Sequence, residues 1–217
     1  MVSTTVPEAL EACLDALQRH GLLLQQDQRL PSLVGIIAGG PLRGSWWGHP
    51  TGASIYHTIQ ALEDHPDVLE TKLVAGKVTY VHRRLWPAAV SVGSSRAGWQ
   101  LEALSPAAVW LLDYVTQDGE LQLNDLPLPA GLNPKDLPAG ARQIERRLLA
   151  RGLSVHTPSG AHAKCLESWD HWQQRTSLAG RRPPLGEAQR HLEQAAETLA
   201  PGAAGLLPWR TPPAKRR

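Results

Sequence analysis

The chain has 217 residues, of which 42% are hydrophobic and 19% charged, so it is long enough for one large or two small globular cores. Its formal net charge is only +2, so any basic character must be local, and two cysteines, Cys13 and Cys165, exclude a disulfide scaffold and favour a reducing compartment. No run approaches the roughly 18 apolar residues that a membrane span needs, and the first residues lack a signal-peptide pattern, so we expect a cytoplasmic protein with no membrane partner.

The N-terminal part of the chain predicts three helices followed by a hairpin. A first helix begins near Pro7, which suits a first helical turn, and stops at Gly21 after a leucine stripe. A second apolar segment carries helix signals and ends at Gly39. The turn at 75–76 separates two runs rich in β-branched residues, which predicts a tight hairpin. The expected elements are helices over 7–20, 30–39 and 53–64 and strands over 68–74 and 77–83.

The C-terminal part predicts a second set of helices and a second hairpin. Ser105 and Pro106 form a helix start, and Gly152 follows a strong amphipathic helix. A turn over 158–160 joins two short strands, while the glycine- and serine-rich residues 93–98 are typical of a linker. The expected elements are helices over 105–118, 139–151, 169–176 and 187–199 and strands over 153–157 and 162–168.

Residues 53–84 and 139–169 share one pattern, an amphipathic helix that runs directly into a short β-hairpin, with basic residues in both. This pattern resembles the second half of a winged helix, and the chain as a whole resembles the tandem winged-helix DNA-binding proteins. The resemblance implies an α+β, mainly helical fold class with two winged-helix-like units. The implied divisions are winged-helix-like domains over 1–90 and 105–178, a linker over 91–104, a C-terminal helix over 179–200 and a disordered basic tail over 201–217.

In a winged helix, the helix before the wing enters the major groove. With Ile55 facing inward, the outward residues of the first such helix include Ser54, His57, Thr58 and Gln60. The backbone amides that precede them offer a phosphate site at the helix N-terminus, at Thr51 and Gly52. The alternative interpretation is an ordinary polar helix face.

The second such helix is richer in arginine. Arg142 and Arg146 are one turn apart on a common face, and Gln143, Arg147 and Arg151 are expected to project from the same side, opposite Ile144 and Leu148. Such a cationic surface releases counterions when it neutralises phosphates. A solvated charged face, or pairing with the acidic residues that precede the helix, is the alternative.

The hairpins carry further basic residues. Lys72 and Lys77 flank the first turn and Arg83 and Arg84 close it, while His156, His162 and Lys164 belong to the second wing. Wing residues typically touch the DNA backbone or the minor groove, where they position the protein without reading sequence. Charges that protect a sheet edge against aggregation are the competing interpretation.

Two adjacent tryptophans, Trp46 and Trp47, lie in a glycine-rich stretch with Arg43 and His49. Exposed rings there would suit base stacking or wedging into a duplex. Structural packing of at least one ring is the alternative, because two neighbouring side chains rarely share one buried face. Glycines at 44, 48 and 52 provide the bends of this loop.

The sequence favours binding over catalysis. His156, His162 and Cys165 lack an evident fourth ligand, so neither a structural zinc nor another cofactor is expected. Acidic residues cluster at the end of the 53–64 helix, where solvation or pairing with Lys72 and Arg83 competes with an active-site interpretation. Hydrolase, P-loop and dinucleotide signatures are absent, so whether a catalytic step exists stays open.

These observations favour a bacterial protein that binds double-stranded DNA in repair, chromosome organisation or transcription, with a homodimer or a protein partner also compatible. Two alternatives are a DNA-repair enzyme such as a base-excision glycosylase, and a winged-helix scaffold for protein interactions. The expected nucleic-acid-binding residues are Arg43, Trp46, Trp47, His57, Gln60, Lys72, Lys77, Arg83, Arg84, Arg142, Arg146, Arg147 and Lys164.

Overall fold

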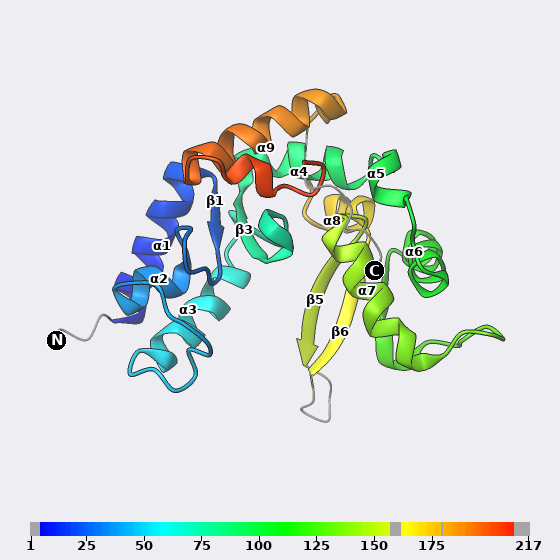
Figure 1. The fold of residues 1–217 in the computed structure, drawn as a ribbon, viewed down its shortest axis with the longest axis horizontal. Helices are drawn as coiled ribbons and strands as arrows, with labels where there is room; N and C mark the ends of the chain where they lie inside the picture. Colours follow the sequence, from blue (N-terminus) through cyan, green and yellow to red (C-terminus); the bar gives the residue numbers. More distant parts are fainter. Residues whose placement is uncertain (1–4, 157–161, 179, 211–217) are drawn as a thin grey trace. The chain divides into compact units, whose positions relative to one another are not determined.

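The computed structural model describes residues 5–156, 162–178 and 180–210, which form an α+β structure that is mainly helical (Figure 1). The chain is divided into two compact units, one of residues 1–86 and 189–217 and one of residues 87–188. Each unit contains a three-stranded antiparallel sheet. Within the described ranges, no helix is both long and apolar enough to cross a membrane.

The first unit begins with the order helix, strand, helix, helix, strand, strand. Its sheet has the strand order β1-β3-β2, so the last strand lies between the other two, and Val81 pairs with Leu22 on one side and Leu69 on the other. The elements are α1 (Val6–His20), β1 (Leu22–Leu24), α2 (Leu33–Ala38), α3 (Gly52–Glu63), β2 (Val68–Lys72) and β3 (Val78–His82).

Helix α1 begins and ends at the residues that its sequence predicts. The Glu8 carboxylate accepts hydrogen bonds from the Thr5 amide and hydroxyl, both at 2.8 Å, and Pro7 occupies the first turn. Gly21 ends the helix with a φ of 83°, and its amide donates to the Leu17 carbonyl. The turn at Gly21 leads straight into β1.

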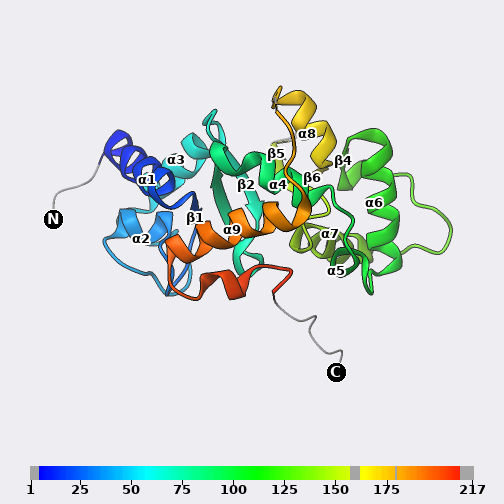
Figure 2. The same cartoon turned by 90° about the horizontal axis from the view of Figure 1, so that it is seen from above.

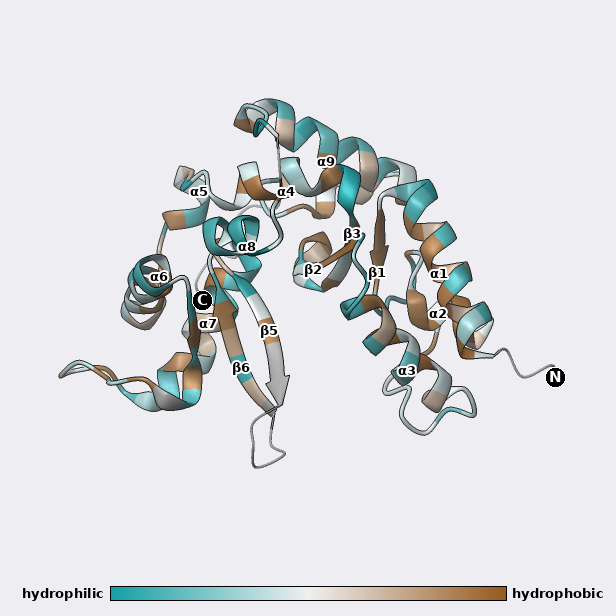
Figure 3. Ribbon diagram, turned by 180° about the vertical axis from the view of Figure 1, so that it is seen from behind, coloured by the Kyte–Doolittle hydropathy of each residue, from teal (hydrophilic) through white to brown (hydrophobic). Residues whose placement is uncertain are grey.

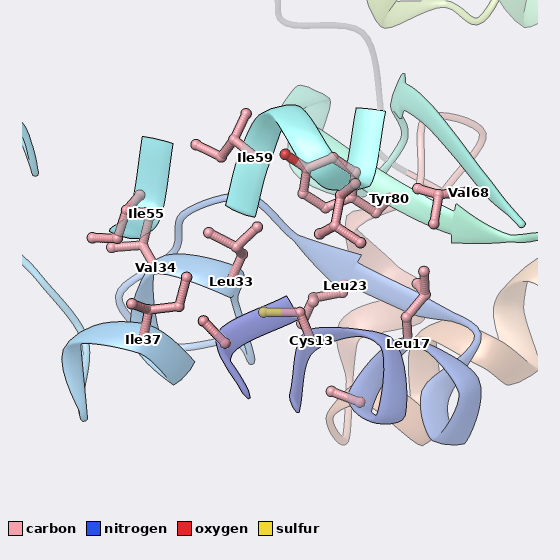
Figure 4. Close-up of a cluster of buried hydrophobic side chains, with 13 residues drawn as sticks. Cys13, Leu17, Leu23, Leu33, Val34, Ile37, Ile55, Ile59, Val68 and Tyr80 are labelled. Atoms are coloured by element: carbon pink, nitrogen blue, oxygen red, sulfur yellow. The ribbon is translucent and has the colours of Figure 1, made fainter. Parts of the chain in front are cut away.

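The core of the first unit gathers apolar side chains from the three helices and the sheet. Figure 4 shows side chains of α1, α2 and α3 converging on Leu23 of β1 and Tyr80 of β3. Full burial of such side chains contributes about 1.5 to 3 kcal/mol each. The buried members labelled in the figure are Cys13, Leu17, Leu23, Leu33, Val34, Ile37, Ile55, Ile59, Val68 and Tyr80.

Strand β1 is an element that sequence reasoning missed. All three of its leucines are fully buried, and Figure 3 shows the strand as uniformly hydrophobic. A run of three apolar residues directly after a helix shows no alternation, so its periodicity does not distinguish a strand from the helix end. Its pairing with β3 makes it a strand.

The second unit repeats a similar order. Its sheet has the order β4-β6-β5, and His156 pairs with His162 at the end of the β5–β6 ladder. The expected turn over 158–160 lies outside the described residues. The elements are α4 (Trp86–Gly93), α5 (Gly98–Leu101), α6 (Pro106–Asp118), β4 (Glu120–Gln122), α7 (Leu137–Arg146), β5 (Arg151–His156), β6 (His162–Glu167) and α8 (Trp169–Arg175).

Helices α6 and α7 form most of the second core. Ser105 caps α6 by accepting a hydrogen bond from the Ala108 amide at 3.2 Å, as the Ser-Pro start predicts. Leu111 and Val115 of α6 pack with Ile144 of α7 and Leu166 of β6 in a continuous buried cluster. The packing of these helices on the sheet places the opposite face of α7 at the surface.

The stretch expected as a linker, 91–104, contains the end of α4 and all of α5. Gln100, which is fully buried, explains why the stretch is ordered. Its Nε2 donates to the carbonyls of Val92 and Arg147, and its Oε1 accepts from the Ala97 amide at 2.9 Å. The polar composition of residues 91–104 therefore did not indicate that Gln100 holds them in place through buried hydrogen bonds.

The tail expected to be disordered from 201 is ordered over 201–210. After α9 (Leu185–Leu199), a short 3₁₀ turn, η5 (Ala203–Leu206), brings the chain back alongside α9, as Figures 1 and 2 show. Leu207 is fully buried, and the indole of Trp209 and the guanidinium of Arg210 both donate to Glu193. Residues 201–210 are ordered despite their polar composition, because Leu207 is buried and Glu193 binds both Trp209 and Arg210. Residues 211–217 lie outside the described residues.

Candidate nucleic-acid interface

Helix α3 packs its isoleucines inward and presents a mixed polar and aromatic face. Ile55 and Ile59 are buried as expected. His57 is exposed, whereas Gln60 is half-buried and its Nε2 donates to the Tyr56 hydroxyl over 3.0 Å. The outward face of α3 therefore consists of an aromatic ring with a hydrogen-bonding group on either side.

Two expectations for α3 are corrected. Thr58 is fully buried, because it lies on the inward side, and its hydroxyl donates to the Ser54 carbonyl at 2.8 Å. The amides of Thr51 and Gly52 are already used, since they donate to His49 Nδ1 and to the His49 carbonyl. These two amides are therefore not available to a phosphate.

Before α3, the two tryptophans stack on each other. Their ring centroids are 4.3 Å apart with an interplanar angle of 24°. Trp46 is half-buried and packs against the first core, whereas Trp47 is 67% exposed. Tyr56 of α3 lies 5.6 Å from Trp47 and 5.3 Å from the His57 ring. One ring thus serves packing, as one interpretation held, and the other reaches the surface.

Internal hydrogen bonds hold the tryptophan loop. The His49 amide donates to the Trp46 carbonyl at 2.9 Å and the Gly52 amide to the His49 carbonyl at 2.8 Å. His49 Nδ1 accepts from the Thr51 amide and is 2.8 Å from the Thr51 hydroxyl. A Cβ at Gly52 would lie 3.0 Å from the Trp46 carbonyl oxygen, so the close approach needs glycine.

The basic residues of the first hairpin are mostly engaged within the unit. Lys77 forms an ion pair with Asp27 at 2.5 Å, and Arg83 forms one with Asp67 at 2.9 Å. Lys72 is half-buried. Two of the basic side chains expected to contact DNA, those of Lys77 and Arg83, are therefore already paired with carboxylates of the same unit.

Arg84 has a structural role in the same unit. Its guanidinium donates to the carbonyls of Gln18 and Arg19, at the C-terminal end of α1. These carbonyls have no partner within the helix, and a cation there also opposes the helix dipole. Arg84 was expected to contact nucleic acid, and this α1 cap occupies its guanidinium instead.

On α7, two of the expected arginines are free. Arg142 and Arg146 are exposed, one turn apart, and opposite the buried Ile144. Gln143, expected on the same face, is half-buried and bridges to the segment before α6: its Oε1 accepts from the Ser105 amide at 3.0 Å. The cationic face of α7 is therefore narrower than its sequence indicates.

Arg147 does not belong to that face. Its Nη1 donates to three backbone carbonyls at the C-terminal end of helix α5, those of Trp99, Gln100 and Glu102. Helix α7 ends at Arg146 and the backbone then turns, with Leu148 at a φ of 55°. That turn sends the Arg147 side chain to α5.

Arg151 lies in β5, not on a helix face. It is buried, and its Nη1 is 2.6 Å from the Glu167 carboxylate. The same carboxylate accepts from Arg175 at 2.8 Å and lies 3.0 Å from His171 Nδ1. The expected helix over 139–151 is thus too long, because the turn after Arg146 starts the sheet earlier.

Lys164 on β6 is also paired. Its Nζ is 2.6 Å from the Glu145 carboxylate, which is buried on α7. Gly152 makes this possible, because a Cβ there would overlap the Glu145 carboxylate. The lysine expected to touch the DNA backbone instead compensates a buried charge.

The acidic residues at the end of α3 divide between an ion pair, Asp67 with Arg83, and a carboxyl pair, Glu63 with Glu70, in which partial burial raises the pKa of Glu63. Asp67 binds Arg83 through both its side chain and its backbone carbonyl, and Asp64 is exposed. Solvation or pairing with Lys72 and Arg83 was the competing interpretation of this cluster; the Arg83–Asp67 ion pair agrees with it, whereas the Glu63–Glu70 pair was not expected.

In the described part of the chain, no group of three or more His, Cys, Asp or Glu side chains is placed to hold a metal ion. The side chains of His156 and His162 lie outside the described residues. Both cysteines are buried free thiols, and burial raises the pKa of Cys165 and that of Cys13, the latter to about 12. Burial and the raised pKa both disfavour the reactive thiolate form of these two side chains.

Of the arginines expected to contact nucleic acid, Arg43, Arg142 and Arg146 have side chains without an ion pair or hydrogen bond among the described residues. Together with exposed Trp47 and His57, they are the expected binding residues whose side chains are exposed and not engaged in an ion pair. Comparisons with protein-family models, curated proteins and solved structures give no match to this chain. Its function is therefore argued from these groups and their scaffold.

Proposed function

We propose that the chain binds double-stranded DNA through two winged-helix units, with α3 and α7 as the helices that face the major groove. The connectivity of the first unit supports this proposal. Helix, strand, two helices and a hairpin, with the first strand paired to the last, is the arrangement expected of a winged helix. The second unit repeats the first helix, the strand that pairs with the last one, and the helix before the hairpin, and this repetition is the observation that carries the proposal.

The second unit differs in one respect. Between β4 and α7, short 3₁₀ turns, η3 (Leu123–Asp125) and η4 (Pro134–Asp136), stand where the first unit has helix α2. The helix that precedes the hairpin and the sheet order are nevertheless the same. The proposal depends on those two features, because they place the recognition helix and the wing.

The side chains that we propose to contact DNA divide into two roles. Arg142 and Arg146 of α7 neutralise phosphates, which positions the protein and makes the affinity depend on salt. His57 and Gln60 of α3 have donors and acceptors suited to base edges. A net charge of only +2 means that this local chemistry, and not the overall charge, attracts the polyanion. Repair, chromosome organisation and transcription are the roles that such binding serves.

The test is fluorescence anisotropy with a labelled duplex at two salt concentrations. Loss of two phosphate contacts in the double variant Arg142→Ala, Arg146→Ala should weaken binding at least about tenfold. It should also reduce the slope of log affinity against log salt by about two. Circular dichroism checks that the variant is folded.

A matched control removes the same two charges elsewhere. Arg19→Ala with Arg190→Ala changes the net charge equally, on α1 and α9, and should leave the salt slope unchanged. If both double variants behave alike, α7 is not the contact surface. Absence of binding below about 10 µM at low salt would contradict DNA binding itself, because non-specific binding normally falls at about 10⁻⁴ to 10⁻⁶ M at physiological salt.

A further inference from the structure

We infer that the stacked pair Trp46–Trp47, with Tyr56 beside it, receives an unstacked nucleobase, so that the preferred ligand is DNA with an unpaired base. This inference rests on the proposed function, since the first unit must already approach DNA. It adds the class of DNA that is bound. We refer to these three rings as the aromatic platform.

The exposure of Trp47 is the first observation. Its exposed fraction of 67% is the highest among the large hydrophobic residues that are exposed in the described part of the chain. An indole that serves packing is buried, as Trp46 largely is. The Trp47 ring is therefore held out of the core while its neighbour anchors the loop.

The second observation is that the ring is held in place. Trp46 supports one face of Trp47 at 4.3 Å, and Tyr56 contacts it at 5.6 Å from a regular helix. The loop hydrogen bonds around His49 and the close approach at Gly52 fix the backbone on both sides. A ring fixed before binding loses little conformational entropy when a ligand stacks on it.

The third observation is the chemistry around the platform. Arg43, on the same loop, is exposed and has no partner among the described residues. His57 lies beside Tyr56 at 5.3 Å and is also exposed. An aromatic face with a hydrogen-bonding group beside it and an unpaired cation on the same loop matches a nucleotide, which combines a π face with a phosphate. An apolar protein partner would match neither Arg43 nor His57.

Within a matched duplex, the faces of the bases are covered by their neighbours. An aromatic side chain reaches a base face only where a base is unpaired or a step has been opened. The cost of opening is lowest where pairing is already lost. The platform therefore selects a bulge, mismatch or gap over an intact duplex, through stacking that tolerates any base.

The test measures the affinity of the full chain for a labelled 25-base-pair duplex and for the same duplex with one bulged base. Wild-type protein should prefer the bulge by about tenfold, within the range given by stacking of one base on an aromatic ring. Trp47→Ala should remove this preference, because the affinity for the bulged duplex should fall about tenfold more than the affinity for the intact duplex. Trp47→Phe should restore part of the preference.

Val109→Ala is the matched control, because Val109 is an exposed apolar residue of α6, in the second unit, and should keep the preference. Equal affinity of wild type for both duplexes, or an equal loss for both in Trp47→Ala, would overturn the inference while the proposed duplex binding stands. Failure to bind either DNA would overturn both proposals. Circular dichroism spectra that match wild type show that each variant is folded.

Discussion

The pKa of Glu167 is set by the residues that surround its carboxylate. Its carboxylate is fully buried, which raises the pKa, but hydrogen bonds from Arg175 and the charge of Arg151 outweigh burial and hold the pKa below 4.5. A group whose pKa is lowered on folding stabilises the protein above its unfolded pKa. That contribution is lost as the pH falls through the folded value.

Glu167→Gln should therefore destabilise the protein at neutral pH and make it less sensitive to acid. Removal of the charge leaves Arg151 buried without its carboxylate, which costs about 3 to 5 kcal/mol. Urea unfolding followed by circular dichroism at pH 7 should show the loss. The difference between the unfolding free energies of variant and wild type should shrink as the pH falls below the ordinary carboxyl pKa of 4.5.

Asp170→Asn is the control for this prediction. Asp170 pairs with Arg182 at 2.6 Å, but both side chains are substantially exposed. An exposed pair contributes about 0 to 1 kcal/mol, so the change at pH 7 should be small. A wild-type stability equal to that of Glu167→Gln would mean that the buried carboxylate contributes nothing to folding.

At the scale of elements, α4 and α8 pack through a glycine. A Cβ at Gly93, on α4, would lie 2.5 Å from Cδ1 of the Trp169 indole, so only a glycine fits. Trp169 cannot move away easily, because it is buried and its Nε1 donates to the Leu148 carbonyl at 2.6 Å. The ring thereby connects α8 to the turn after α7.

Gly93→Ala should destabilise the second unit by about 1 to 3 kcal/mol, because a methyl group is forced against a rigid ring. Gly98→Ala, in α5, is a matched control with no atom within 4 Å of the new Cβ, and it should stabilise by about 0.4 to 1 kcal/mol. Thermal unfolding of both variants gives the comparison. Equal effects would show that the α4–α8 contact accommodates a methyl group.

At the scale of the whole molecule, the chain returns to its first unit after completing the second. Residues 189–217 group with residues 1–86, and α9 contributes a stripe of buried side chains. His20 of α1 hydrogen-bonds the Thr198 carbonyl at 2.9 Å, and Ala195 lies close to Gly21. The C-terminal segment is thus part of the first unit, and residues 1–86 alone lack it.

Leu192→Ala should therefore loosen the N-terminal unit, although it lies more than a hundred residues further along the chain. Leu192 is fully buried, and such a truncation costs about 2 to 5 kcal/mol. Amide exchange at Leu22–Leu24 of β1 should accelerate at least about 30-fold where it depends on opening of this unit. The control Gln194→Ala changes an exposed residue of the same helix. An unchanged amide-exchange rate in β1 would show that α9 does not stabilise the first unit.

The sequence by itself determined the class of structure and many of its elements. Apolar periodicity, Pro7, Gly21 and the Ser105–Pro106 start predict helices that the structure contains, because caps and helix-period burial are local properties. The strand pairs of the two hairpins were also predicted, because β-branched runs around a turn are a local signal. The tight turn expected at 75–76 is instead a 3₁₀ turn over Val74–Gly76, and β2 ends earlier, at Lys72. Strand β1 was not predicted, since a three-residue strand exists only through its pairing with distant β3.

Only the tertiary structure decided which of the predicted site residues are available. Arg142, Arg146 and Arg147 are alike in sequence, yet the turn after α7 directs Arg147 to the carbonyls of α5 and leaves the other two exposed. Trp46 and Trp47 are separated in the same way, one anchored in the core and one held at the surface. The partners of Arg147 and Trp46 are residues far away along the chain, so the local sequence does not reveal these contacts.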